Sequence, residues 1–268
     1  ALEREIVEAA RTWDEDLLEV ARAERGEEAG ARFAGLYGKA FPEAYKEDFT
    51  PRVGVADVRR IEALDTDEAV EINMYAAPGA PREERRFKLY RRGPLSLTRV
   101  LPLFTHLGVE VTDERPYVLR RADGVSVHVY DFGLRLADPE LWGDAHDREQ
   151  CRVRFQDAFA AQWHGRAESD QFNALVLAAG LDWRQVLVLR AVAKYLRQTQ
   201  ATFSQDYVES ALLTHPDIAR DLVELFETRF DPRRHAGVAG PERAAAADAV
   251  VERITDALVD VTSLDHDR

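Results

Sequence analysis

Apolar side chains recur every three or four positions through residues 1–49, and this spacing is typical of one face of an α-helix. Gly26 separates a first helical stretch from a second one, and Pro42 and Pro51 then interrupt the pattern. We therefore expect this part of the chain to be helical. The apolar positions are Ile6, Ala9, Ala10, Trp13, Leu17, Leu18 and Ala21 in the first stretch, and Phe33, Leu36 and Tyr37 in the second.

Between residues 50 and 137 the pattern changes, because runs in which apolar and polar residues alternate join the helical ones. Alternation is typical of a strand with one buried face. The predicted elements are a helix over about 53–64, strands at 69–76 and 85–92 joined by a Pro/Gly turn, a helix over about 97–107 ended by Gly108, and strands from Val109 toward Leu119 and from Val125 to Tyr130.

The predicted order αββαββ is a circular permutation of βαββαβ, the split βαβ arrangement of ferredoxin-like folds. If strand 85–92 counts as the first strand of that topology, strand 69–76 becomes its last, and these two strands are neighbours in the parent sheet. A hairpin between them is compatible with that arrangement. We therefore expect an α+β domain in which two helices cover one face of a four-stranded antiparallel sheet.

Residues 138–268 return to helical spacing. Asp182 and Gln185 form a capping box, and Pro216 stands at the first turn of a helix. Residues 231–241 contain two prolines and two glycines and are expected to be a linker before a last helix with one apolar face. The five helical segments before that linker are FQDAFAAQWHGRA, SDQFNALVLAAG, DWRQVLVLRAVAKYLRQ, SQDYVESALL and HPDIARDLVELFETRF.

The charge distribution excludes some partners. The 49 acidic and 36 basic residues give a net charge of −13, with acidic flanks and a nearly neutral middle, so we expect neither nucleic acid nor an anionic membrane as the main partner. No apolar run reaches the roughly 18 residues of a membrane span, and no signal peptide opens the chain. We expect a cytoplasmic protein. The single cysteine, Cys151, excludes an internal disulfide framework and a Cys-rich zinc site.

Sequence motifs of common enzyme sites are absent, including the glycine-rich nucleotide loops, His-Glu-x-x-His and Gly-x-Ser-x-Gly. His164 and Glu168 have the i, i+4 spacing of a metal-ligand pair on one helix, but no third ligand is visible, and a surface pair is the favoured interpretation. His128 on the polar face of a strand and His106 near a helix end are expected to be solvated. We therefore predict no catalytic, cofactor-binding or metal-binding residue in this chain.

A basic cluster lies between residues 82 and 92. On its own it suggests phosphate binding, but Arg86, Lys88 and Arg92 share one face of a strand, and the adjacent strand supplies Glu71. Cross-strand ion pairing is therefore the favoured interpretation. The cluster consists of Arg82, Arg85, Arg86, Lys88, Arg91 and Arg92.

The loop over residues 92–96 is the one candidate binding site. Gly93 precedes a predicted helix N-terminus, whose free N–H groups and positive dipole end favour a carboxylate. An amino acid could bind there, in contact with Gly93, Leu95 and Ser96. The competing interpretation, which the spacing favours, is an ordinary strand-to-helix turn capped by Ser96.

Long stretches of the sequence resemble the large bacterial type of NAD-dependent glutamate dehydrogenase, from about Ala40 to Asp267. The run RRGPLSLTRVLPLFTHLGVEV also resembles the strand, Pro/Gly loop, helix and strand of ACT modules, in agreement with the topology read from periodicity. The other stretches are FPEAYKEDFTPR, VADVRRIEAL, VHVYDFGL and QFNALVLAAGLDWRQVLVLRAVAKYLRQTQATFSQDYV.

The resemblance implies a domain organisation. Residues 1–49 would be the end of a preceding helical motif, 50–137 the last ACT-like domain, 138–230 a helical motif, and 231–268 a linker and helix leading into a catalytic domain beyond this chain. The family's catalytic residues and NAD site have no counterparts here, so this fragment alone is expected to be inactive.

The resemblance also implies partners. They would be the other subunits of a homo-oligomer, a tetramer, and the protein's own C-terminal catalytic domain. We expect a non-catalytic regulatory and assembly segment of the enzyme that converts L-glutamate to 2-oxoglutarate with NAD. The alternative is an amino-acid-sensing module without an assembly role, with an amino-acid effector at Gly93, Leu95 and Ser96.

Overall fold

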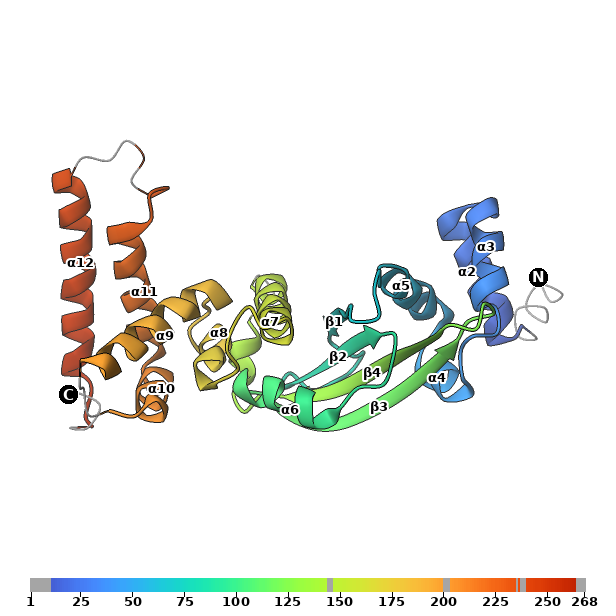
Figure 1. The fold of residues 1–268 in the computed structure, drawn as a ribbon, viewed down its shortest axis with the longest axis horizontal. Helices are drawn as coiled ribbons and strands as arrows, with labels where there is room; N and C mark the ends of the chain where they lie inside the picture. The colour runs from blue at the N-terminus through green and yellow to red at the C-terminus, as the bar shows by residue number, and fades with distance from the viewer. Residues whose placement is uncertain (1–10, 144–146, 200–202, 235, 237–239, 264–268) are drawn as a thin grey trace. The chain divides into compact units, whose positions relative to one another are not determined.

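The computed structural model describes residues 11–143, 147–199, 203–234, 236 and 240–263. The predicted helical positions Ile6, Ala9 and Ala10 lie outside these residues. Contacts divide the chain into two compact units, which we describe separately (Figure 1). Unit 1 comprises Ala1–Ala80, Glu84–Ser96 and Thr112–Leu134, and unit 2 comprises Pro81–Glu83, Leu97–Val111 and Arg135–Arg268.

The N-terminal part of unit 1 is helical, as predicted. The capping box of Thr12 and Glu15 begins the first described helix, because the threonine hydroxyl and the glutamate satisfy N–H groups that have no partner within the helix. Pro51 stands at the first turn of the last of these helices, where its missing N–H is harmless. The helices are α2 (Trp13–Arg25), α3 (Glu27–Tyr37), α4 (Glu43–Asp48) and α5 (Pro51–Glu62).

The four predicted strands are confirmed and form one sheet in the order β1-β2-β4-β3. The strands β2 and β3 are joined through a helix, and β4 lies between them, which is the split βαβ arrangement expected for a permuted ferredoxin-like fold. β1 pairs antiparallel with β2, with Glu71 opposite Tyr90 and Tyr75 opposite Arg86. The strands are β1 (Glu71–Tyr75), β2 (Glu84–Arg91), β3 (Glu110–Arg120) and β4 (Ser126–Arg135).

The core of unit 1 lies between its helices and the sheet. α5 contacts α2 on one side and both β1 and β2 on the other. Leu17, Tyr37, Val58 and Leu119 are all fully buried in this cluster. Of the two helices expected to cover the sheet, α5 contacts β1 and β2. The other, α6 (Leu97–His106), belongs to unit 2, where it contacts α7 and η2.

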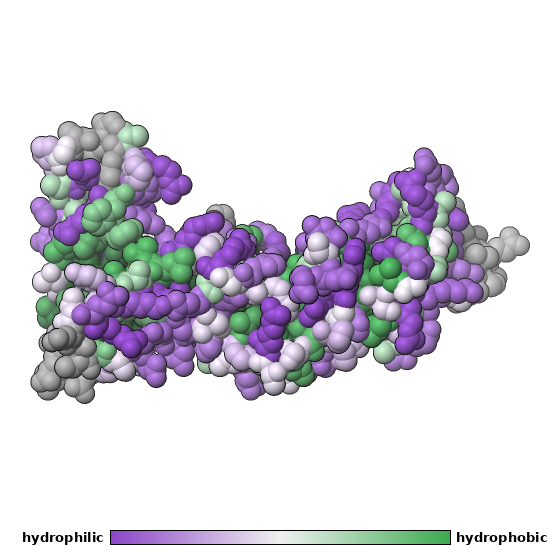
Figure 2. All heavy atoms as spheres, in the orientation of Figure 1, coloured by the Kyte–Doolittle hydropathy of each residue, from purple (hydrophilic) through white to green (hydrophobic). Residues whose placement is uncertain are grey.

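Unit 2 is helical. Phe104 of α6 and Phe159 of α7 lie 5.0 Å apart between ring centroids, and Arg253 of α12 forms ion pairs with Asp221 and Glu224 of α11. The space-filling view shows hydrophobic surface at the α11–α12 end (Figure 2). The remaining elements are η1 (Pro139–Trp142), α7 (Arg148–Trp163), η2 (Gln171–Ala174), α8 (Leu175–Ala178), α9 (Trp183–Gln198), α10 (Gln205–Thr214), α11 (Pro216–Phe230) and α12 (Gly240–Val259).

Two helical predictions in unit 2 need correction. The segment SDQFNALVLAAG is a 3₁₀ turn followed by one short helix, and within it the Asn173 side chain donates to the Glu168 carbonyl oxygen. The helix expected to carry both His164 and Glu168 ends at Trp163, since Gly165 adopts φ +66°, a left-handed conformation that glycine tolerates. The capping box of Asp182 and Gln185 is confirmed.

Close contact between α2 and α3 depends on Gly30. A Cβ atom there would lie 2.9 Å from the Cα atom of Arg22, so the two backbones must move apart. Gly30→Ala should lower the free energy of unfolding by about 1–3 kcal/mol, measured by urea denaturation. Gly35→Ala in the same helix meets nothing within 4 Å and should raise it by up to about 1 kcal/mol, because alanine is the better helix former. Equal effects of the two substitutions would contradict this packing.

Candidate functional site

The loop predicted to bind a carboxylate connects β2 to α6 (Figure 1). Gly93 adopts φ +151°, and a Cβ atom there would meet nothing within 4 Å. The Leu95 N–H donates to the Tyr130 hydroxyl at 2.8 Å, so the protein itself already uses one backbone donor of the loop. Ser96 is exposed and directly precedes the first residue of α6. Effector binding at Gly93, Leu95 and Ser96 stays a prediction.

Tyr130 links this loop to His128. The two rings stack at 6.1 Å between centroids with an angle of 10° between their planes, and His128 Nδ1 lies 3.4 Å from the Tyr130 hydroxyl. Burial, followed by the charge of Arg91, lowers the pKa of His128 below its ordinary value. His128 is therefore half-buried against an aromatic ring and only partly exposed to solvent.

Arg86 and Lys88 of the basic cluster are engaged in ion pairs, as the favoured interpretation predicted. Arg86 binds Asp113 and Asp131, with shortest N–O distances of 2.7 and 3.2 Å. Lys88 binds Asp57 at 2.6 Å. The acids that pair with Arg86 and Lys88 come from α5, β3 and β4 rather than from β1. The expected partner Glu71, on β1, lies instead 3.9 Å from Arg60 of α5.

Asp57 is the centre of a buried polar site between α5 and the sheet. The Lys88 ammonium donates to its Oδ2 atom at 2.6 Å, and the Tyr45 hydroxyl donates to the same oxygen at 2.5 Å. The Tyr90 hydroxyl donates to Oδ1 at 2.7 Å. Asp57 is 3% exposed and Lys88 1%. Both charges are therefore outside water, and each depends on the other for compensation.

Asp131 on β4 forms a second acidic centre beside the first. Its Oδ2 atom accepts from the Tyr75 hydroxyl at 3.0 Å and from Arg86 Nε at 3.2 Å. Its Oδ1 atom is buried and has no hydrogen-bond donor among the described residues. We call Tyr45, Asp57, Tyr75, Arg86, Lys88, Tyr90 and Asp131 the buried charge network.

Burial dominates the electrostatics of this network. It lowers the pKa of Lys88 against the opposing effect of Asp57, and it raises the pKa of Asp131 against the opposing charge of Arg86. The phenols respond in the same direction: burial first, and then the charge of Asp57, raise the pKa of Tyr45 and Tyr90. The phenols therefore remain hydrogen-bond donors to the carboxylate at neutral pH.

Aromatic rings surround the Lys88 ammonium. Its nitrogen lies 3.4 Å from the ring centroid of Phe49, 5.3 Å from that of Tyr45 and 5.7 Å from that of Tyr75. An ammonium over the face of an aromatic ring is attracted by the ring quadrupole. These rings thus replace part of the hydration that Lys88 loses on burial.

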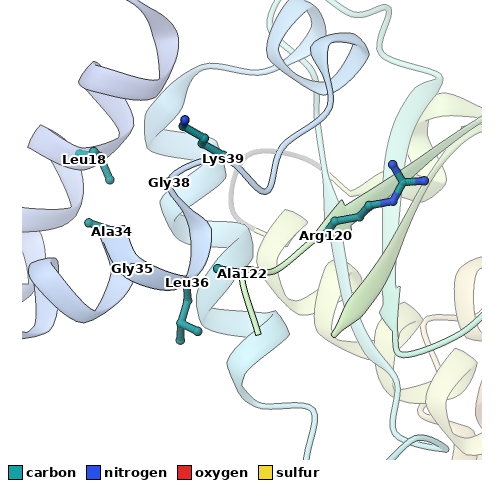
Figure 3. A pocket seen from close by; sticks show the side chains of 8 residues that line it. All are labelled: Leu18, Ala34, Gly35, Leu36, Gly38, Lys39, Arg120 and Ala122. Atoms are coloured by element: carbon teal, nitrogen blue, oxygen red, sulfur yellow. The ribbon is translucent and has the colours of Figure 1, made fainter. Parts of the chain in front are cut away.

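An open cavity of about 360 Å³ lies elsewhere in unit 1. Arg120, at the end of β3, and Ala122 line one side of it. Their N–H groups donate to the carbonyl oxygens of Ala40 and Leu36, respectively, which holds this side against the helical part of the unit. Figure 3 shows the Lys39 and Arg120 side chains pointing in different directions rather than converging. Because no polar groups meet in it, we assign no ligand to this cavity.

The candidate metal pair is not assembled. Glu168 forms an ion pair with Lys194, and His164 stands at the end of α7. Within the described part of the chain, no cluster of three His, Cys, Asp or Glu side chains could hold a metal ion. His106 Nδ1 lies 2.7 Å from the Ser169 hydroxyl oxygen.

Three segments match family models of glutamate dehydrogenase. Residues 20–64 match helical motif 2, residues 69–149 match the ACT3 domain, and residues 167–232 match helical motif 3. The chain is 37% identical over 269 aligned residues to the NAD-specific glutamate dehydrogenase of Halomonas elongata. That alignment covers 100% of this chain and 16% of the relative.

Two other relatives with the same name agree. The protein of Mycobacterium tuberculosis is 40% identical over 98% of this chain, and that of Pseudomonas aeruginosa is 38% identical over 85% of it. The chain belongs to the NAD-specific glutamate dehydrogenase family. It spans 16% and 14% of the lengths of these two relatives, respectively.

The buried charge network joins two segments that match different family models. α5, which carries Asp57, lies inside the match to helical motif 2, whereas β1, β2 and β4 lie inside the match to ACT3. The domain predicted from the sequence over residues 50–137 includes α5 together with the sheet, and this domain boundary stays a prediction. Among the described residues, no helix has the length and apolar character that crossing a membrane needs.

Sequence reasoning missed the pairing of Asp57 with Lys88. Lys88 belongs to the predicted basic cluster, but Asp57 occupies an ordinary polar position of the predicted amphipathic helix. The available signal was the position of Lys88 between Phe87 and Leu89 on a strand with bulky residues on both faces. A lysine at such a position is buried, and a buried lysine requires an acid.

The hydroxyl of Tyr90 is the donor recorded on Asp57 Oδ1. Tyr90→Phe removes it and leaves a buried, charged oxygen without that hydrogen bond. We expect the free energy of unfolding to fall by about 1–3 kcal/mol, measured by urea denaturation. Tyr195→Phe is the control, since Tyr195 is 64% exposed, and it should change the value by less than about 0.5 kcal/mol. A neutral Tyr90→Phe would contradict the network.

Proposed function

We propose that this chain is a non-catalytic regulatory and assembly segment of an NAD-dependent glutamate dehydrogenase. The parent protein would convert L-glutamate, NAD⁺ and water into 2-oxoglutarate, ammonium, NADH and a proton. The observation that carries the proposal is the succession of matches to helical motif 2, ACT3 and helical motif 3 along one chain. The name of the relatives supports the reaction.

The residues of this chain do not fit an NAD site. A dinucleotide's phosphates need several glycines in one loop at a helix N-terminus. The described glycines with positive φ stand one at a time at turns and helix ends, as Gly26, Gly108 and Gly165 do. We therefore place the nicotinamide chemistry in the parent protein outside these 268 residues, and we assign no catalytic residue or cofactor to this chain.

An apolar stripe on α9 supports the assembly role. Val192, Tyr195 and Leu196 have the i, i+3, i+4 spacing of one helix face and are 48%, 64% and 45% exposed. Large apolar side chains on one exposed face are typical of a surface that binds another protein. We propose that a neighbouring subunit of the same protein covers this stripe, because homo-oligomers bury matching faces of identical chains.

Self-association tests the assembly role. We expect the molar mass of the 268-residue chain in size-exclusion chromatography with light scattering to rise with concentration. Tyr195→Ser should shift the profile toward the monomer, because it removes the most exposed side chain of the stripe. Glu252→Ser, at an exposed position of α12, is the control and should leave the profile unchanged. A strict monomer at high concentration would count against assembly through this segment.

The second candidate function is amino-acid sensing at the loop of Gly93, Leu95 and Ser96. The observation that favours it is the open space beside Gly93, which would let a ligand approach the backbone. The use of the Leu95 N–H by Tyr130 leaves fewer donors for a carboxylate. The loop is therefore the weaker of the two proposals.

Isothermal titration with a panel of amino acids tests sensing. If the loop binds a carboxylate, one amino acid should release heat, and Ser96→Asp should abolish the signal by charge repulsion. Ser204 caps α10 by accepting from the Tyr207 N–H, so Ser204→Asp is the matched control and should retain both binding and stability, because aspartate caps well. No heat from any amino acid would remove this proposal.

A further inference from the structure

The two carboxylates of the buried charge network are unequally satisfied. Asp57 on α5 accepts hydrogen bonds from Tyr45, Lys88 and Tyr90. Asp131 on β4 has donors on Oδ2 alone, and its buried Oδ1 has none among the described residues. A buried carboxylate oxygen without a donor costs free energy, so Asp131 has an acceptor position ready for a further N–H group.

Tyr75 contacts both Lys88 and Asp131. Its ammonium lies 5.7 Å from the ring centroid of Tyr75, and the hydroxyl of the same Tyr75 is hydrogen-bonded to Asp131. The Asp131 charge raises the pKa of Lys88, and the Lys88 charge lowers that of Asp131, although burial opposes both effects. The two side chains therefore interact already in the observed arrangement.

The chemistry of the lysine side chain allows its ammonium to change partners. Lysine carries three N–H donors on a flexible four-carbon stem, and one contact of Lys88, with Asp57 Oδ2, is a recorded ion pair. Phe49, Tyr45 and Tyr75 offer aromatic faces around it. A cation that leaves Asp57 toward Asp131 therefore stays next to aromatic rings instead of entering an aliphatic core.

We propose that Lys88 is an exchangeable tie between α5 and the sheet, whose ammonium can pass from Asp57 to Oδ1 of Asp131. The observed arrangement fastens α5 to β2. In the second arrangement the lysine is paired within the sheet, Asp57 keeps the hydroxyl donors of Tyr45 and Tyr90, and α5 is held on the sheet less firmly. Two alternative pairings of one cation form a two-state element, which a binding partner can bias by favouring either state.

The exchange would act between two modules of the family. Asp57 lies in the match to helical motif 2, whereas Lys88 and Asp131 lie in the match to ACT3. A change of partner at Lys88 alters how firmly the helical motif is held on the ACT3 sheet. The proposal concerns this packing alone, and it does not depend on the reaction of the parent protein.

A double-mutant cycle on the 268-residue chain tests the exchange. In Asp57→Asn, Lys88 should move to Asp131, and in Asp131→Asn it should remain on Asp57, so each single variant keeps one ion pair. The double variant leaves the ammonium without an anionic partner. Each single substitution multiplies the unfolding equilibrium constant in urea by some factor. The factor for the double variant should exceed the product of the two single factors by about tenfold or more. A double effect equal to that product would overturn the proposal, because the loss of Asp131 would then cost the same whether or not Lys88 is paired with Asp57.

A second cycle provides the matched control. Asp113 is an acid of the same region, but its recorded ion pairs are with Arg86 and Arg115. Asp57→Asn combined with Asp113→Asn should therefore give the product of the single effects. Coupling as large as that between Asp57 and Asp131 would overturn the proposal, since it would reflect a general loosening of the network.

A direct readout applies if the double variant does not fold. In a crystal structure of the Asp57→Asn variant, Lys88 Nζ should lie within hydrogen-bond distance of Asp131 Oδ1. Hydrogen exchange of the α5 amides should also accelerate, while the amides of β2 and β4 keep their protection. Lys88 still bound to residue 57, or turned to solvent, would overturn the proposal.

Discussion

Unit 1 depends on the compensation of one buried charge. The Asp57 carboxylate of α5 is paired with the Lys88 ammonium of the sheet. The hydroxyls of Tyr45 and Tyr90 donate the other hydrogen bonds to this carboxylate. Such a pair adds little net stability over an apolar core of equal volume, but it is costly to break. Its main contribution is to position, because few arrangements of α5 on the sheet satisfy all these groups together.

The fold could be predicted largely from local patterns. Alternation located β1 and β2, and helical spacing located α5 and α9, because each of these elements buries one face and exposes the other. The prediction was poorer where a side chain interrupts a helix. Asn173, in the 3₁₀ turn, donates to the Glu168 carbonyl, and Gly165 follows the end of α7 before Glu168. Neither event leaves a mark on the spacing of apolar residues.

The polar sites were harder to predict, for a physical reason. Ion pairing on β2 was expected, but the partners of Arg86 and Lys88 come from elements 45 and 31 residues away in the chain. The contact of Arg86 depends on the order of the strands in the sheet and that of Lys88 on how α5 lies across it, and no local pattern encodes either. The loop at Gly93, by contrast, was located from its residues alone, because a glycine before a helix requires only the conformation of neighbouring residues.

Partly and fully buried phenols set an alkaline limit for unit 1. Burial raises the pKa of Tyr37, Tyr45, Tyr75, Tyr90 and Tyr117 above the ordinary value of 10.0. The folded chain therefore keeps protons that the unfolded chain releases, and the stability that depends on them is present below pH 10 and is lost as the pH rises beyond it. Removal of the proton from Tyr45 or Tyr90 would place a phenolate beside the Asp57 carboxylate, and the repulsion between the two anions would weaken the contact of α5 with the sheet.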